Sequence, residues 1–186
     1  MWQPPECTAS GGFFLLVGWF IASCGWEPAL LVLGAAAFHE LGHILALRYF
    51  RVNIRRIRIR AAGAVLETEG AMGYGQELAA VLAGPLANLL AAFLLGWAGE
   101  PTASGANAVL GFFNLLPIRP LDGGSALYLL LAWMAGPETA EWGCRWVGGS
   151  AALAAAAGTV WLVWQTRGSL WLLPAVAGLL LAAWKA

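Results

Sequence analysis

The two histidines of this 186-residue chain stand four positions apart, in the segment His39-Glu40-Leu41-Gly42-His43. Side chains at positions i and i+4 of a helix lie on one face, so both imidazoles can bind one cation, with Glu40 beside them as general base. The alternative is a pair of histidines satisfied inside a helix bundle, which is costly in an apolar segment without a cation. The spacing therefore predicts a metal site with His39 and His43 as ligands and one Zn²⁺ per chain.

A catalytic zinc ion takes three protein ligands and keeps a fourth position for water. The chain has no third histidine, and its one aspartate, Asp122, lies in the segment Asn114-Leu-Leu-Pro-Ile-Arg-Pro-Leu-Asp-Gly-Gly124. We expect Asp122 to be the third ligand; its alternative role is the N-cap of a helix that starts near Ser125. Asn114 is expected to donate a hydrogen bond to the developing oxyanion, and its alternative role is a helix–helix hydrogen bond.

The composition places this chemistry in a membrane. Apolar residues make up 60% of the chain and charged residues 11%, and the mean hydropathy is +0.72. Soluble proteins have about 45–50% apolar and about 25% charged residues. A formal net charge of zero also argues against a nucleic-acid partner bound through a basic surface. The expected fold class is therefore an all-α polytopic membrane protein.

Windows free of charged residues predict about six transmembrane helices, since one crossing needs about 20 apolar residues. The fourth window is too long for one crossing, because a continuous helix over it would measure about 46 Å against a hydrocarbon core of about 30 Å. It also contains prolines and glycines, which predict an irregular stretch at 117–124 between two helices. Irregular backbone at membrane depth is tolerated where it lines a cavity, so this break suits a buried site. The expected crossings are 10–25, 28–48, 77–98, 104–134, 145–165 and 168–184.

The basic residues predict the orientation. Six of the ten lysines and arginines lie between Arg48 and Arg60, which places this loop in the cytoplasm by the positive-inside rule. We therefore expect a multi-pass protein of the cell membrane with both termini cytoplasmic. The histidines lie five and nine residues before Arg48, roughly 8–14 Å from the cytoplasmic end of their helix. Alternation over 52–69 predicts a small cytoplasmic β-hairpin after the second crossing, with a turn at 61–63 and an exposed edge on which a substrate could add as a strand.

Three motifs together resemble the site-2 protease family of intramembrane zinc metalloproteases. They are H-E-x-G-H at 39–43, G-P-x-x-N at 84–88 and N-x-x-P-x-x-P-L-D-G-G at 114–124. Over about residues 30–135 the chain is most similar to the compact bacterial subgroup that includes a sporulation protease processing a sigma-factor precursor. The resemblance implies that His39, His43 and Asp122 bind zinc, that Glu40 is the catalytic base, and that substrates are single-span or membrane-associated proteins. The G-P-x-x-N segment has two open interpretations, close helix packing with a kink or contact with the substrate.

We therefore expect one membrane-embedded protease domain over 1–186, a zinc metalloendopeptidase that cleaves peptide bonds within the membrane. No PDZ or nucleotide-sensing domain is recognised, so the expected partners are a membrane protein substrate, the lipid bilayer and a regulatory membrane protein. Three alternatives stay open. The chain could bind or transport metal without proteolysis; a zinc protease could take its third ligand from Glu138 or Glu141; or a scaffold could have kept the metal site without activity.

Overall fold

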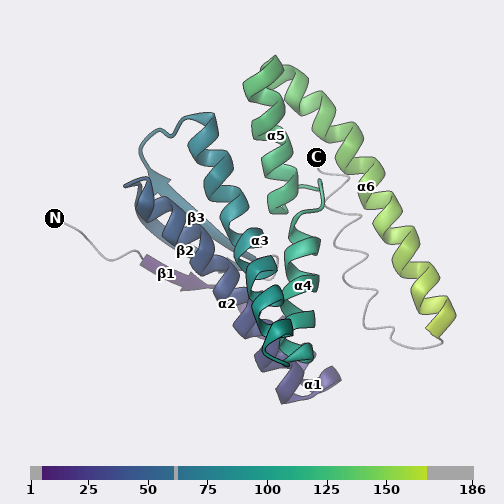
Figure 1. The fold of residues 1–186 in the computed structure, drawn as a ribbon. Coiled ribbons are helices and arrows are strands. Elements are labelled where there is room, and N and C mark those ends of the chain that lie inside the picture. The colour runs from purple at the N-terminus through teal and green to yellow at the C-terminus, as the bar shows by residue number, and fades with distance from the viewer. Residues whose placement is uncertain (1–5, 61–62, 167–186) are drawn as a thin grey trace. The chain divides into compact units, whose positions relative to one another are not determined.

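The computed structural model describes residues 6–60 and 63–166, which are mostly helical with one small sheet (Figure 1). The chain divides into two compact units, Met1–Phe112 and Phe113–Ala186. The helices are α1 (Gly11–Cys24), α2 (Trp26–Tyr49), α3 (Tyr74–Trp97), α4 (Pro101–Asn114), α5 (Asp122–Ala135) and α6 (Pro137–Thr166), and the strands are β1 (Glu6–Ala9), β2 (Asn53–Arg60) and β3 (Gly63–Glu69).

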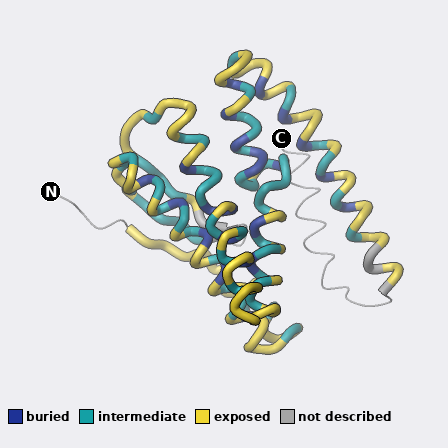
Figure 2. Tube along the Cα trace, in the orientation of Figure 1, coloured by how far each residue is buried: buried dark blue, intermediate teal, exposed yellow. Residues whose placement is uncertain are grey.

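Two helices of the first unit, α2 and α3, are long and apolar enough to cross a membrane. Each has 24 residues, or about 36 Å of helix, against a hydrocarbon core of about 30 Å. Helix α1 is apolar but has 14 residues, or about 21 Å, and so is shorter than the crossing expected at 10–25. Exposed residues run along these helices (Figure 2) and include many large apolar side chains, as lipid contact requires. Examples are Phe14, Leu30, Leu45, Leu90 and Phe93.

Helices α2 and α3 approach each other closely through small residues. A Cβ atom added to Gly42 of α2 would lie 2.6 Å from the carbonyl oxygen of Ala83 on α3, which is closer than real Cβ contacts. Ala35 and Ala80 are buried on the same two helices. Small side chains at a membrane helix interface allow the two backbones to approach, and here they leave space for larger polar groups between the helices.

The sheet follows α2 in the chain and confirms the expected hairpin. Strands β2 and β3 pair antiparallel, with Ile57 opposite Leu66, and a bulge between Ile54 and Arg56 shifts the register. The expected turn lies partly outside the described residues. A third strand, β1, was not expected: it pairs parallel with β2, with Glu6 opposite Arg56, so the strand order is β1-β2-β3.

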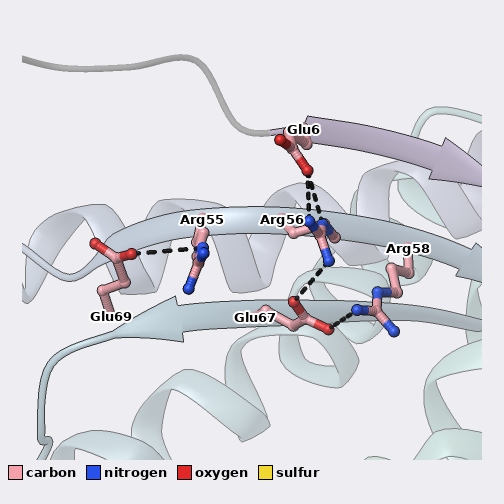
Figure 3. A network of polar contacts seen from close by, with 6 residues as sticks. All are labelled: Glu6, Arg55, Arg56, Arg58, Glu67 and Glu69. Atoms are coloured by element: carbon pink, nitrogen blue, oxygen red, sulfur yellow. Dashed lines mark hydrogen bonds and ion pairs between the residues drawn. The ribbon is translucent and has the colours of Figure 1, made fainter.

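Ion pairs connect the three strands (Figure 3). The carboxylate of Glu6 accepts hydrogen bonds from Arg56 Nε and Nη2 at 2.9 and 2.7 Å. Glu67 lies 3.8 Å from Arg56 and 2.8 Å from Arg58, and Arg55 lies 3.7 Å from Glu69. The hydrogen bond and the charge of Glu6 raise the pKa of Arg56. Three of the six basic residues between Arg48 and Arg60, on which the expected membrane orientation rests, thus also form ion pairs between the strands. They are Arg55, Arg56 and Arg58.

The second unit contains the expected break. Residues 115–121 are irregular and carry turn hydrogen bonds, among them Ile118 N to Leu116 O at 2.7 Å and Leu121 N to Ile118 O at 2.8 Å. The break ends earlier than expected, because Gly123 and Gly124 lie in the first turn of α5. A Cβ atom on Gly123 would collide with the carbonyl group of Leu115, and one on Gly124 would lie 2.5 Å from the carbonyl carbon of Ile118. The two glycines therefore let the helix start directly against the irregular segment.

Helix α6 starts earlier than the crossing expected at 145–165. It has 30 residues and follows Gly136, whose φ of 90° ends α5. Its first turns carry Glu138 and Glu141, and both are exposed. The crossing expected at 168–184 lies outside the described residues.

Candidate metal centre

His39 and His43 lie side by side on α2. Their exposed fractions are 5% and 9%, so both imidazoles are buried. Their Nε2 atoms are 3.1 Å apart, and their rings meet edge to face with centroids 4.8 Å apart. The structure thus brings together the two histidines that the i, i+4 spacing predicts on one helix face.

The Nδ1 atom of His39 is held by α3. It lies 2.7 Å from Asn88 Oδ1. The Nδ2 atom of Asn88 donates to Ala35 O at 3.0 Å and to Asn107 Oδ1 at 2.8 Å, so Asn88 Oδ1 is the acceptor. His39 Nδ1 must therefore carry the hydrogen, which makes Nε2 the acceptor nitrogen of the neutral ring.

The same holds for His43. Its Nδ1 atom lies 2.8 Å from the carbonyl oxygen of Ala80, which can only accept a hydrogen bond. Each Nε2 then carries a lone pair in the neutral ring, and two such lone pairs 3.1 Å apart repel each other unless a proton or cation lies between them. Two nitrogens on one tetrahedral zinc ion, at Zn–N distances of 2.0–2.1 Å, are about 3.4 Å apart. The donor pair therefore fits Zn²⁺.

Helix α3 also makes room for His43. Gly84 is buried, and a Cβ atom at this position would overlap the His43 ring, 2.6 Å from its Cε1 atom. Pro85 and Asn88 follow on the same helix and are also buried. The G-P-x-x-N segment is thus an interhelical packing motif, as one of its two interpretations predicts, and it contacts the two histidines directly. Its contact with a substrate stays a prediction.

Glu40 follows His39 on α2 and is half-buried. The remaining predicted site residues flank the break in the second unit, with Asn114 as the last residue of α4 and Asp122 as the first residue of α5. Both are half-buried. The N-cap of α5 is Leu121, without a side-chain cap, so the alternative role of Asp122 as an N-cap is wrong. A carboxylate in the first turn still interacts favourably with the helix dipole.

Asn107 on α4 was not among the residues predicted from the sequence; it is 7% exposed, and its Oδ1 atom accepts a hydrogen bond from Asn88 Nδ2. One signal was present: an amide side chain in a window without charges is a polar group in an apolar segment, and such groups need partners. The sequence does not show that the partner of Asn107 is Asn88, which lies 19 positions away on another helix.

Comparisons with known proteins give one similar solved structure and two curated relatives. No protein-family model matches the chain. In structure it is similar to the site-2 protease from Methanocaldococcus jannaschii, with a TM-score of 0.70 and 22% identity, over 100% of this chain and 93% of that one. This likeness shows the fold.

Two curated relatives add sequence similarity. The chain is 32% identical over 130 residues to stage IV sporulation protein FB of Bacillus subtilis, covering 61% of this chain and 45% of that protein. It is 30% identical over 115 residues to a zinc metalloprotease of M. jannaschii, covering 55% and 34%. The matches thus span less than half the length of these relatives. Together with the solved structure, they confirm the resemblance to site-2 proteases.

Proposed function

We propose that this chain is an intramembrane zinc metalloprotease that hydrolyses peptide bonds of single-span or membrane-associated proteins. The observation that carries the proposal is the pair of buried histidines whose Nε2 atoms lie 3.1 Å apart, with Glu40 next in sequence to His39. The relatives that are named as a zinc metalloprotease and a site-2 protease support the same activity. No observation favours metal transport, for which ligands would be needed along a path across the bilayer.

We assign one zinc ion per chain to His39, His43 and Asp122. Asp122 is the one aspartate of the chain, and its position at the start of α5 is fixed by the tight packing of the two glycines that follow it. The other candidates for the third ligand, Glu138 and Glu141, are exposed on α6. Buried or half-buried ligands with fixed geometry suit a catalytic zinc site better than exposed carboxylates do.

Zinc in such a site makes water more acidic and polarises a carbonyl group. Glu40 takes the proton of the attacking water and passes a proton to the leaving amine, as the general base and then the general acid. Asn114 donates a hydrogen bond to the oxyanion through its amide. His39 and His43 hold their ring orientations by donating their Nδ1 hydrogens to Asn88 Oδ1 and Ala80 O.

We further propose a multi-pass protein of the cell membrane with six crossings and both termini in the cytoplasm. The basic cluster between Arg48 and Arg60 supports this orientation. It would place the histidines close to the cytoplasmic surface, from which water reaches the site. The lipid bilayer and a regulatory membrane protein complete the proposed partners.

A helical substrate hides its carbonyl groups and must be held extended before it is cleaved. The hairpin could hold it by strand addition. Because β1 pairs with β2, the β2 edge of the hairpin is covered, and the β3 edge is the one we assign to the substrate. Proline substitutions in β3 that leave cleavage unchanged would remove this step.

The activity is tested by co-expressing candidate single-span substrates with the wild type or with Glu40→Gln. We expect a shortened product with the wild type alone, while the zinc content of both proteins is the same. Cleavage by both proteins would assign the activity to another protease, and zinc-dependent flux without cleavage would favour a transporter.

A further inference from the structure

We propose that Asn88 and Asn107 form an amide relay that holds His39 in the tautomer with its hydrogen on Nδ1, so that Nε2 faces the metal. Both residues would be positioning residues that act through His39. The inference rests on the proposed zinc site. It gives a positioning role to Asn107 of α4, which is part of none of the three sequence motifs. Its basis is a chain of three hydrogen bonds, from α4 through α3 to α2.

The amide of Asn88 has only one acceptable orientation. Its side chain is 0% exposed, so no bulk water can replace a missing partner. Its oxygen lies 2.7 Å from His39 Nδ1, and its nitrogen donates to Ala35 O and Asn107 Oδ1. A flip of this amide would place the oxygen against two acceptors, so the bonds to Ala35 O and Asn107 Oδ1 would be lost, and the NH₂ group could face Nδ1 only if the ring hydrogen moved to Nε2.

Asn107 is oriented in turn by its own helix. Its Nδ2 atom donates to Ala103 O at 3.0 Å, which leaves Oδ1 directed at Asn88. Hydrogen donation therefore runs from His39 Nδ1 to Asn88, from Asn88 to Asn107 and from Asn107 to Ala103 O, so the backbone acceptor on α4 fixes the orientation of both amides. Hydrogen bonds to the outer nitrogen of a ligating histidine fix its tautomer and its ring orientation, and their loss weakens metal binding.

A different explanation is that the two asparagines only hold helices α3 and α4 together. The chain offers a matched control for this explanation. Ser104 on α4 donates to Ala92 O on α3 at 2.7 Å, which is a hydrogen bond between the same two helices without any contact to His39. Ser104→Ala therefore removes one hydrogen bond between α3 and α4 and leaves the amide relay intact.

The first experiment measures the zinc affinity of the full chain in detergent by competition with a chromogenic chelator. We expect Asn88→Leu to weaken the affinity about 10- to 100-fold, in the range known for such outer partners. Asn107→Leu should have a smaller effect in the same direction, and Ser104→Ala should change the affinity less than twofold. Asn88→Asp keeps an acceptor for His39 Nδ1 but loses the donor bonds to Ala35 O and Asn107 Oδ1, so its affinity should lie between those of the wild type and Asn88→Leu.

The second experiment needs no metal and no activity. Nitrogen-15 NMR of the metal-free protein should show His39 with its hydrogen on Nδ1 in the wild type, and a shift toward the other tautomer in Asn88→Leu. If Asn88→Leu does not fold, the same comparison is made with Asn107→Leu, which should show a smaller shift in the same direction. Wild-type affinity together with a wild-type tautomer in the leucine variants would overturn the relay. A wild type that binds no zinc would instead refute the proposed function, and the tautomer measurement would still decide on the relay.

Discussion

Gly84 of α3 lies against the imidazole of His43, so closely that any side chain at position 84 would occupy the space of the ring. Four residues further on, Asn88 bonds to His39. The H-x-x-x-H spacing on α2 thus faces a G-x-x-x-N spacing on α3. Gly84 leaves space for His43, and Asn88 accepts a hydrogen bond from His39. This matching explains why the proposed metal site depends on two helices even though both imidazoles come from one.

Gly84→Ala should therefore damage the proposed metal site. The added methyl group would push the His43 ring aside, with a loss of about 1–3 kcal/mol of stability from overpacking and a zinc affinity at least about tenfold weaker. Chemical denaturation and chelator competition measure the two effects. Gly34→Ala on α2 is the control, because a Cβ atom there has no atom within 4 Å, and it should leave the zinc affinity unchanged. Equal behaviour of the two variants would contradict this role of Gly84.

Asp122→Asn should reduce the zinc content of the purified protein to a small fraction of the wild-type value, because a neutral amide is a much weaker zinc ligand than a carboxylate. Metal analysis after dialysis measures this directly. Glu141→Gln changes an exposed acidic residue of α6 in the same way and should retain full zinc. The opposite result for the two variants would transfer the third ligand to Glu141.

Local spacing made part of this site predictable from the sequence. The two histidines are four positions apart on one helix, so their contact depends on helix geometry alone. The break between α4 and α5 was also predictable, because prolines and excess length indicate it. The role of Asn88 stayed open since its partner His39 is 49 positions away on another helix. Strand β1 was missed for a similar reason: four residues carry almost no pattern, and Glu6 pairs with Arg56 across the whole length of α1 and α2.

The start of α6 shows a different limit. Windows without charge predict where a helix crosses a membrane, but they omit charged turns that extend the helix beyond it. Pro137 and Glu138 are typical of the first turn of a helix, since proline lacks the N–H that would have no partner there and a carboxylate favours the dipole. Reading these start signals would have placed the beginning of α6 eight residues earlier than the expected 145.

Gly123→Ala should destabilise the second unit by about 1–3 kcal/mol and abolish cleavage, because the new Cβ atom would collide with the carbonyl group of Leu115 and displace the first turn of α5, including Asp122. Thermal unfolding and a cleavage assay test this prediction. Gly149→Ala in α6 introduces the same methyl group where a Cβ atom has no atom within 4 Å. It should leave both stability and cleavage close to the wild type, and a similar loss in both variants would remove the special role of Gly123.

Glu6→Gln should loosen β1 from the sheet. The carboxylate of Glu6 accepts two hydrogen bonds from Arg56 and raises its pKa, and a neutral amide would keep at most part of this interaction. We expect faster hydrogen exchange at the amide of Ser10, which donates to Ile59 O at 2.9 Å. Glu69→Gln is the control, since Glu69 pairs with Arg55 on the other side of β2 and lies away from β1. Unchanged exchange at Ser10 in Glu6→Gln, or an equal increase in Glu69→Gln, would show that the backbone pairing of β1 does not depend on this ion pair.

Zinc removal should lower the thermal stability of the wild type, since a ligand that binds only the folded state stabilises it by RT ln(1 + [L]/Kd), about 4 kcal/mol at a thousandfold excess over Kd. Unfolding temperatures measured with added zinc and with a chelator should therefore differ. The difference should vanish in His43→Ala, which lacks one imidazole of the pair, and persist in Glu40→Gln, which lacks only the proposed base. A zinc-dependent shift that survives in His43→Ala would place the stabilising ion elsewhere in the protein.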